Sequence, residues 1–284
     1  MGLGPKCRAG KTGPPGEPSR RRCGGRSRGI SSAATTRAPA ARAGAGRSTS
    51  AHGPATKDLP RRLLYFVCVK LIRLFLVVFC RWQVTGRGNV PCIGGTIIAP
   101  NHISYLDPPV AGSAFDRQIF FMAKAELFEV PFLGWLIRQY GAFPVRRGVA
   151  DRVALRQAER LLCAGEAVMV FPEGTRSADG RLMPSELGIA MLALRTGATV
   201  LPIGVDGTDR AMPMHSLVIR PARVRIRIGP PLRFDDLHRG GPLNREVVEE
   251  AARRITAALV PLLPAWRTAR IRQSPLGSGS PTSV

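Results

Sequence analysis

The sequence predicts an α/β protein, with a mixed and largely parallel sheet flanked by helices and preceded by an N-terminal interfacial helix. From residue 94 onward, short apolar runs alternate with helical patterns, which is the order that builds such a sheet. Hydrophobic residues make up 44% of the 284 residues and charged residues 21%, as in ordinary globular proteins. Only one stretch approaches the length needed to cross a bilayer, which excludes a multi-pass membrane protein.

Shifts in composition predict four segments. Residues 1–58 are rich in Gly, Pro, Ala, Ser, Thr and Arg and contain too few large apolar side chains to offset the entropy of ordering. We therefore expect a disordered basic tail over 1–58 and a membrane-interfacial helix over 59–86. The globular domain is expected over 87–264, and a flexible C-terminal tail over 265–284.

The chain is strongly basic, with 42 Lys and Arg against 19 Asp and Glu and a net charge of +23. Residues 1–62 alone hold 14 of these basic residues and 2 of the acidic ones. Such charge attracts nucleic acid, anionic lipid headgroups or phosphorylated substrates without choosing among them. The tail is compatible with a transit peptide, a binding arm, or upstream sequence added by a misassigned start, and we favour the last or a functionless tail.

Residues 63–80, LLYFVCVKLIRLFLVVFC, are apolar but interrupted by Lys70 and Arg73, which lie on one helical face. A charge near the middle of a spanning helix costs about 2.5–3.5 kcal/mol on insertion scales. With Arg61, Arg62 and Arg81 flanking it, the segment favours an interfacial helix or shallow anchor. The alternative is an ordinary buried helix packed on the domain.

The remaining elements follow from β-rich runs and helical periodicity. Helices are predicted at about 149–164, 187–196 and 244–262. The six predicted strands are Thr96–Ala99, Ile119–Met122, Ala142–Val145, Ala167–Phe171, Thr199–Val205 and Val224–Ile228.

The cysteine spacing predicts neither a disulfide framework nor a zinc site, because no two cysteines form a CxxC pair. A reducing cytoplasm is the simpler interpretation. The six are Cys7, Cys23, Cys68, Cys80, Cys92 and Cys163.

Residues 99–107, APNHISYLD, place a histidine and an aspartate at the end of a predicted strand, where α/β proteins position their sites. In a continuous helix, His102 and Asp107 would point about 140° apart. A contact between them needs a loop, which Pro100 and the pair Pro108–Pro109 favour. If they meet, Asp107 fixes the imidazole tautomer and leaves the other nitrogen as a general base. The alternative is that both residues only cap the next helix.

Residues 170–177, VFPEGTRS, form a second polar block after an apolar run. Arg176 lies beside small, hydroxylated and glycine residues, which suits a phosphate site through bidentate hydrogen bonds and close backbone approach. Glu173 is expected to hold this arginine or to accept a substrate hydroxyl. The alternative is a surface turn with a solvated ion pair.

Together, the two blocks resemble the signature of the glycerolipid acyltransferase family, which includes lysophosphatidic acid acyltransferase. That family carries NHxxxxD and FPEGTRS in this order. Residues 141–147, GAFPVRR, resemble its intervening motif, which ends in an arginine, and residues 200–203, VLPI, resemble its final proline-containing motif. The resemblance covers roughly residues 63–235.

The resemblance implies a mechanism and assigns residues to it. His102 is the general base that removes the proton from the acceptor hydroxyl, which then attacks an acyl thioester. Asp107 orients His102 and stabilises its charge. The residues implied at the glycerol-phosphate end of the acceptor are Arg147, Glu173, Gly174 and Arg176.

Lys124, in the segment FMAKAELFEVPF, is similar to a family lysine near the site and is expected to stabilise the oxyanion. The alternative is a solvated surface lysine.

Two departures from the family pattern leave the identity of the acceptor open. Residues 182–188, LMPSELG, lack a basic residue common there, and Arg146 replaces a common acidic residue. Arg195 and Arg210 are other candidate phosphate contacts.

The resemblance implies an enzyme of phospholipid biosynthesis. It would move a fatty acyl group from acyl-CoA or acyl-carrier protein to the free hydroxyl of lysophosphatidic acid, forming phosphatidic acid. No dissociable cofactor and no metal are expected, because the thioester itself is the activated species. The expected location is the cytoplasmic face of the cell membrane, peripheral or monotopic, with the membrane surface as a partner.

Two alternatives stay open. Within the family, the acceptor could be glycerol-3-phosphate or another lysolipid. In another class, the chain would be a non-catalytic basic protein that binds lipid or nucleic acid. We expect no nucleic acid, because the alternating arginines of residues 223–227 suit one solvated strand face and no stacking aromatics are interleaved with them.

Overall fold

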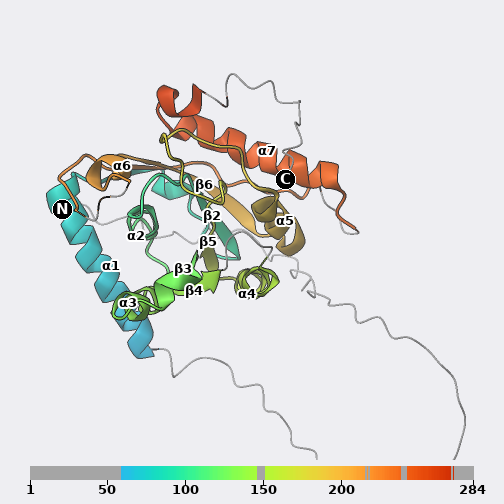
Figure 1. The fold of residues 1–284 in the computed structure, drawn as a ribbon. Helices are drawn as coiled ribbons and strands as arrows, with labels where there is room; N and C mark the ends of the chain where they lie inside the picture. The colour runs from blue at the N-terminus through green and yellow to red at the C-terminus, as the bar shows by residue number, and fades with distance from the viewer. Residues whose placement is uncertain are drawn as a thin grey trace, which may run out of the picture.

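A seven-stranded sheet forms the centre of the structure (Figure 1). The computed structural model describes residues 59–145, 151–214, 216, 218–237, 242–269 and 271. The strand order is β1-β7-β6-β2-β5-β3-β4, and every neighbouring pair is parallel except β6 with β7. The strands are β1 Gln83–Thr85, β2 Thr96–Pro100, β3 Ile119–Lys124, β4 Ala142–Val145, β5 Ala167–Met169, β6 Thr199–Asp206 and β7 Arg225–Ile228.

The central strands are continuous apolar runs because both faces of the sheet are covered. All five residues of β2 and all three of β5 are buried, and so are seven of the eight residues of β6. β7 alternates between half-buried arginines and buried isoleucines, as a strand near the sheet edge does. In the strand order, β2 lies between β5 and β6, so the polar segments that follow these three strands can meet.

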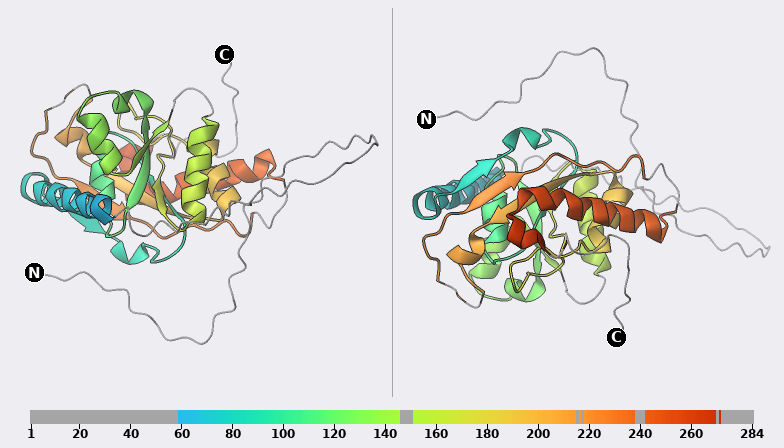
Figure 2. Two further views of the ribbon diagram at one scale, coloured as in Figure 1. Left: turned by 90° about the horizontal axis from the view of Figure 1, so that it is seen from below. Right: turned by 90° about the horizontal axis from the view of Figure 1, so that it is seen from above.

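Helices cover both faces of the sheet, giving three layers (Figures 1 and 2). One hydrophobic core joins α1, α2 and the end of α3 to the sheet, and the other joins α4, α5 and α7 to the opposite face. The helices are α1 Leu59–Cys80, α2 Asp107–Gly112, α3 Leu133–Gln139, α4 Arg152–Cys163, α5 Leu187–Thr196, α6 Thr208–Ala211 and α7 Arg245–Leu259. Short 3-10 helices are η1 Arg87–Asn89, η2 Ala125–Phe128, η3 Val260–Leu262 and η4 Ala265–Thr268.

The predicted α/β class is confirmed, and the six predicted strands lie within a few residues of β2–β7. β1 was not predicted, because its three residues show no apolar run of their own and pair with β7 across most of the chain. α2 and α3 were missed because each spans fewer than two full turns. At the C-terminus, order extends beyond residue 264, because Ala265–Thr268 form η4 within the predicted flexible tail.

The predicted interfacial helix corresponds to α1, which ends at Cys80; Gln83–Thr85 belong to the sheet instead. Within the described residues, Leu63–Cys80 is the one helical stretch long and apolar enough to cross a membrane. One side of α1 packs on the domain, where the side chains of Tyr65, Val69, Leu76 and Cys80 are buried. The other side exposes large apolar side chains.

The two charges of α1 have different environments. Lys70 is exposed. Arg73 turns toward the domain, where its guanidinium donates hydrogen bonds to the carbonyls of Ser113 and Phe115 at 2.6 and 2.5 Å and pairs with Asp116 at 2.7 Å. These carbonyls follow α2, so Arg73 fastens α1 to the end of that helix.

The prediction that the cysteines form no disulfide is wrong for two of them. Cys92, in the loop before β2, and Cys163, the last residue of α4, are disulfide-bonded, whereas Cys68 and Cys80 are free. The segments that carry these two cysteines are in contact, because Gly95 packs on the backbone of Leu162. Sequence spacing carries no signal for this contact, and the cysteine pattern no longer supports a reducing compartment.

Candidate active site

His102 and Asp107 are in contact at the end of β2. The loop after the strand turns back at Ser104, whose carbonyl accepts a hydrogen bond from the Asp107 N–H at 3.2 Å. This places His102 Nδ1 2.9 Å from Asp107 Oδ2. Both side chains are buried, and Asp107 has no exposed surface. The predicted contact is therefore present.

Asp107 is held from several directions. Its Oδ2 also accepts hydrogen bonds from the backbone N–H groups of Ile103 at 2.6 Å and Ser104 at 2.7 Å. Its Oδ1 accepts one from the hydroxyl of Thr208 at 2.6 Å. Because an ionised carboxylate only accepts hydrogen bonds, the His102 ring donates from Nδ1, and its Nε2 carries the free lone pair.

Thr208 is a site residue that the sequence did not reveal. It is buried at the start of α6, directly after β6, and lies 101 residues from Asp107. Gly207 makes the turn into α6 with φ 94°, and a side chain there would collide with the backbone of Arg223. The sheet order brings β6 beside β2, and this supplies the contact.

Asn101 joins the same two strand ends. Its side-chain amide donates to the carbonyl of Val205 at 3.1 Å and accepts from the Val205 N–H at 2.7 Å. These two hydrogen bonds to the β6 backbone fix the start of the loop that carries His102.

The second polar block binds the backbone of His102 on both sides. The His102 N–H donates to Glu173 Oε1 at 2.7 Å, and its carbonyl accepts from the Ser177 N–H at 2.8 Å. The other oxygen of Glu173 accepts from the Met183 N–H at 3.0 Å. Glu173 thus positions His102, whereas the sequence predicted that it would hold Arg176 or a substrate hydroxyl.

The Glu173 carboxyl is buried at 4% exposure. Burial raises its pKa to about 7, and the negative charge of Asp107 adds to this effect. The N–H groups of His102 and Met183 oppose the shift because they stabilise the ionised carboxylate. Glu173 therefore changes its charge near neutral pH.

The His102 ring stacks on Phe171, with ring centroids 3.9 Å apart and an interplanar angle of 25°. Stacking and the bond to Asp107 fix the plane of the imidazole. Within the described residues, Nε2 of His102 has no hydrogen-bond partner and keeps some exposed surface. The site thus presents one basic nitrogen on a fully oriented ring.

Arg176 lies beside this group in a different setting. Its guanidinium carbon lies 3.6 Å from the ring centroid of Tyr105, a half-exposed residue of the first block. Among the described residues it has neither a hydrogen bond nor an acidic partner. A planar cation with free donors suits a phosphate or carboxylate group.

The remaining predicted residues have diverse positions. Gly174 is exposed and makes the turn of the second block with φ 66°. Lys124 ends β3, is half-exposed and pairs with Glu126 at 3.2 Å. The described residues give Lys124 no contact with His102, whose strand β2 lies two strands away, about 10 Å. Arg146 and Arg147 lie outside the described residues.

The two other candidate phosphate contacts have acidic partners. Arg195 pairs with Glu159 of α4 at 3.1 Å, and Arg210 pairs with Asp206 at 3.4 Å. Both arginines are half-exposed. Neither pair joins the His102 loop, so Arg176 is the better-placed cation.

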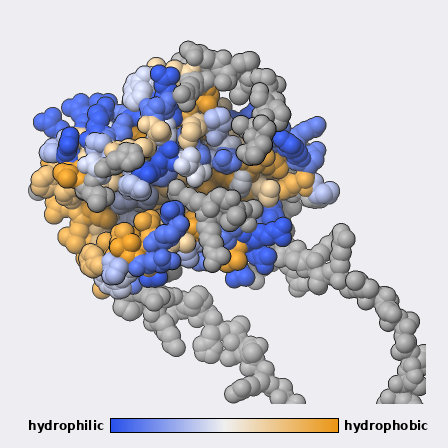
Figure 3. All heavy atoms as spheres, in the orientation of Figure 1, coloured by the Kyte–Doolittle hydropathy of each residue, from blue (hydrophilic) through white to orange (hydrophobic). Residues whose placement is uncertain are grey.

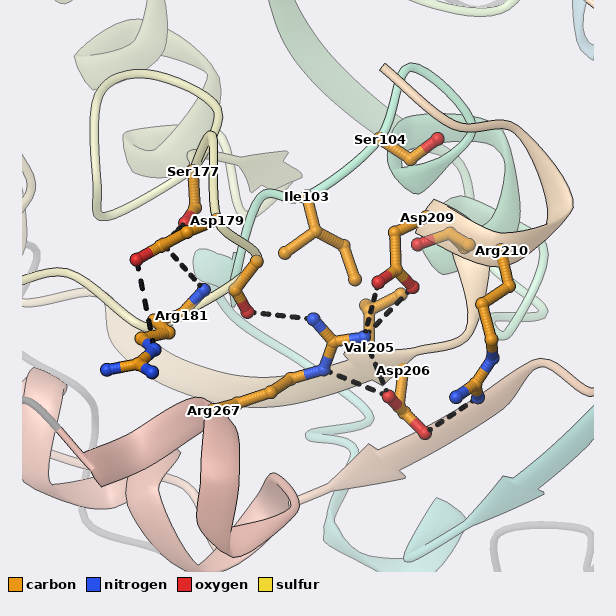
Figure 4. Close-up of polar contacts among 12 residues, drawn as sticks. Ile103, Ser104, Ser177, Asp179, Arg181, Val205, Asp206, Asp209, Arg210 and Arg267 are labelled. Atoms are coloured by element: carbon orange, nitrogen blue, oxygen red, sulfur yellow. Dashed lines mark hydrogen bonds and ion pairs between the residues drawn. The ribbon is translucent and has the colours of Figure 1, made fainter. Parts of the chain in front are cut away.

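A buried arginine, Arg267, connects the loops around the site through hydrogen bonds and ion pairs (Figure 4). Arg267 of η4 has no exposed surface. It donates to the Gly180 carbonyl at 2.7 Å, to Asp206 Oδ1 at 2.9 Å, and to both carboxylate oxygens of Asp209 at 2.8 and 2.9 Å. Asp206 and Asp209 flank Thr208, and Gly180 follows the second block. One side chain therefore ties together the two loops that contact His102 and Asp107.

This arrangement can remove a proton from a hydroxyl group beside a cation that binds an anion. The fold and the site are those of an acyltransferase. In agreement, residues 81–206 match the family described as Acyltransferase. A crystal structure of the 1-acyl-sn-glycerophosphate (LPA) acyltransferase PlsC from Thermotoga maritima is similar, with a TM-score of 0.58 and 30% identity. The similarity covers 71% of this chain and 80% of that one.

Two curated relatives agree with this assignment. A chloroplastic 1-acyl-sn-glycerol-3-phosphate acyltransferase of Brassica napus is 31% identical over 61% of this chain. The 1-acyl-sn-glycerol-3-phosphate acyltransferase of Bacillus subtilis is 27% identical, and the match covers 84% of its length. The chain spans about half the length of the Brassica protein, 51%. It belongs to the acyltransferase family that includes the 1-acyl-sn-glycerol-3-phosphate acyltransferases.

Proposed function

We propose that this protein transfers a fatty acyl group from a thioester, acyl-CoA or acyl-carrier protein, to the free hydroxyl of lysophosphatidic acid. The product is phosphatidic acid, an intermediate of phospholipid biosynthesis. The observation that carries the proposal is the His102–Asp107 pair with a free Nε2, adjoining an arginine that has no acidic partner among the described residues. The family relationship supports it.

His102 is the base of the proposed reaction. Its Nε2 takes the proton of the acceptor hydroxyl while the oxygen attacks the thioester carbonyl carbon, and a C–O bond forms. The tetrahedral intermediate then collapses, the C–S bond breaks, and the imidazolium returns the proton to the departing sulfur. Asp107 faces Nδ1 throughout, so it stabilises the imidazolium without giving up its own charge. This sequence requires no dissociable cofactor, since the thioester supplies the activation.

Arg176 is the proposed contact for the acceptor's phosphate. Its guanidinium, whose carbon lies 3.6 Å from the Tyr105 ring centroid, offers two parallel donors to an anionic oxygen pair. Gly174 gives the loop a backbone that a phosphate can approach closely. Arg147 and Lys124 remain candidates for the phosphate and the oxyanion, respectively. Glycerol-3-phosphate and other lysolipids share the phosphate chemistry, so acceptor profiling decides among them.

The proposed location is the cytoplasmic face of the cell membrane, as a peripheral or monotopic protein. Acceptor and product are lipids, whereas both donors are water-soluble. The exposed apolar side of α1 suits a helix lying in the membrane interface, because Arg73 fastens its other side to the domain.

Acyl transfer by the purified full chain tests the function. Labelled acyl-CoA and acyl-carrier protein would each be offered with lysophosphatidic acid, glycerol-3-phosphate and a neutral lysolipid. We expect lysophosphatidic acid to be the preferred acceptor. His102→Ala should lower the rate by about 10²–10⁴-fold, the usual contribution of a general base. His52→Ala, the same substitution outside the described residues, serves as the matched control and should keep full activity.

Two results would contradict the proposal. A folded His102→Ala variant as active as the wild type would reject the assigned base. If the wild type transfers acyl groups to none of these acceptors from either donor, the non-catalytic lipid- or nucleic-acid-binding alternative would be favoured instead.

A further inference from the structure

A short segment after β3 exposes aromatic side chains with no role in the site described above. Phe132 is 74% exposed and Trp135 50% exposed, and their rings stack with centroids 6.1 Å apart. Phe132 adopts φ 60°, a backbone conformation that residues other than glycine rarely take. The fold thus holds a bulky aromatic side chain outward in an unfavourable conformation, which indicates a function for its exposure.

This aromatic segment, residues 130–135, continues the outer side of α1. The inner side of α3 packs toward α1, since Tyr140 at the end of α3 lies 5.3 Å from Tyr65 between ring centroids. In Figure 1, α3 lies against the N-terminal half of α1, and Figure 3 shows hydrophobic residues gathered over this region. The exposed apolar side chains of the combined face are Leu63, Phe66, Val67, Leu71, Leu74, Val77, Val78, Phe79, Val130, Phe132, Leu133 and Trp135.

The charge around this face has one sign along both helices. Neither α1 nor α3 contains an acidic residue, whereas Lys70 is exposed on α1 and Arg138 lies at the end of α3. The acidic neighbours before this segment are Glu126 and Glu129, both exposed, and Glu126 pairs with Lys124 at 3.2 Å. Trp and Phe beside Lys and Arg are the residues that occupy the boundary between lipid chains and headgroups.

The face lies at the same end of the sheet as the site. β3, β5 and β2 run parallel, so the segment after β3 leaves the same sheet edge as the loops that carry Phe171 and His102. A bilayer surface in contact with residues 130–135 would therefore lie at the end of the sheet where His102 lies.

We infer that residues 130–135 form a second membrane-insertion element, which acts with the outer side of α1 to seat the domain on an anionic bilayer. The inference rests on the proposed function only in taking a lipid substrate. Its test measures membrane contact, so it can fail while the acyl transfer assay succeeds, and the reverse.

The full chain offers a matched pair of tryptophans for this test. Trp266, on η4, is 49% exposed, close to the value for Trp135, but its ring lies 4.2 Å from the guanidinium carbon of Arg267, which bonds Asp206 of β6. One variant keeps only Trp135 (Trp82→Phe with Trp266→Phe), and the other keeps only Trp266 (Trp82→Phe with Trp135→Phe). Each is mixed with vesicles of phosphatidylglycerol and phosphatidylcholine whose acyl chains carry bromine, and vesicle binding is confirmed by sedimentation.

We expect bromine to quench the fluorescence of Trp135 and to leave that of Trp266 unchanged. In addition, Trp135→Ser in the otherwise unaltered chain should weaken vesicle binding about tenfold, because it removes a large apolar side chain from the interface, whereas Trp266→Ser should not. Vesicles of phosphatidylcholine alone should bind less protein.

Three results would overturn the inference. One is a vesicle-bound chain whose Trp135 is not quenched, which would leave α1 as the sole contact. Another is equal quenching of both tryptophans, which would show insertion without a defined face. The third is a folded chain that binds neither kind of vesicle.

Discussion

The His102 side and the Arg176 side of the site are built in opposite ways. Asp107 is completely buried and accepts four hydrogen bonds, and both peptide groups of His102 are bound as well. Arg176 rests on one half-exposed ring and has no acidic partner within the described residues. The proposed proton-transfer half is therefore organised before substrate arrives, whereas the proposed anion-binding half keeps its donors for the ligand.

The largest effect is expected from Asp107→Asn. The amide cannot accept from all the N–H groups that face Asp107, so the imidazole loses its orientation and its charge stabilisation. We expect kcat to fall about a hundredfold or more, in the range typical of general-base catalysis. Steady-state kinetics would measure this, and Asp116→Asn, at an exposed aspartate, should leave kcat unchanged. A fall in kcat of less than about threefold would mean that His102 is oriented without Asp107.

A large loss of stability is expected when Arg267, which supports the His102 side of the site, is replaced. Arg267→Met leaves Asp206 and Asp209 without their buried counter-ion, which should lower the free energy of unfolding by about 3–5 kcal/mol. Arg210→Met removes the exposed partner of the same Asp206 and should cost less than about 1 kcal/mol. Denaturant unfolding measures both, and equal losses would show that the Arg267 network is not the brace of this region.

The pH dependence of stability isolates Glu173. Its pKa is about 7 in the folded protein against 4.5 as its ordinary value, so the folded state keeps the proton more strongly than the unfolded state. The stability that Glu173 contributes is therefore present below pH 4.5 and is lost as the pH rises through about 7. A change of this size corresponds to roughly 3 kcal/mol.

Glu173→Gln should remove this component. We expect the free energy of unfolding of the wild type, relative to the variant, to fall as the pH rises from 4.5 to above 7. Glu186→Gln, the same substitution at an exposed glutamate, serves as the matched control. A difference that is constant with pH would mean that folding does not raise the pKa of Glu173.

The sequence predicted the local parts of this site and missed the parts made by long-range contacts. His102, Asp107 and Arg176 lie in two short polar blocks after apolar strands, so their residue types and positions indicate chemistry. Thr208 and Arg267 have no local signal, because their roles arise from contacts with Asp107 and Asp206 that cross more than fifty residues.

Glu173 shows the same limit in another form. Its residue type and sequence block indicated a functional residue, but the group that its carboxylate contacts was not predicted. Whether a carboxylate faces substrate or a neighbouring backbone depends on the packing of β5 beside β2. The fold class was easier to predict, because periodicity and the alternation of strands and helices are local properties summed along the chain. α1 combines both cases: its apolar length was evident, whereas the burial of Arg73 against α2 was not.

On the exposed half, Arg176→Ala should raise KM for lysophosphatidic acid about tenfold to a hundredfold and change kcat less. Hydrogen bonds to charged groups contribute about 1.5–3 kcal/mol, and this loss falls on substrate binding. Stability should stay within about 0.5 kcal/mol of the wild type, as is usual for partly exposed residues without a hydrogen bond or ion pair among the described residues. Neutral lysolipid acceptors should be unaffected. A fall in kcat with unchanged KM would instead place Arg176 in the chemical step.

The smallest effect concerns Tyr105, which contacts Arg176 through its ring face. Cation–π contacts at exposed sites contribute about 0.5–1 kcal/mol, so Tyr105→Leu should raise KM for lysophosphatidic acid two- to fivefold. Tyr105→Phe retains the ring and should match the wild type. In the Arg176→Ala background, Tyr105→Leu should have no further effect on KM, because the ring then has no cation to orient. Additive effects of the two substitutions would show that Tyr105 acts on the substrate directly, and the anion-binding half would then be less dependent on a single pre-oriented arginine than its geometry indicates.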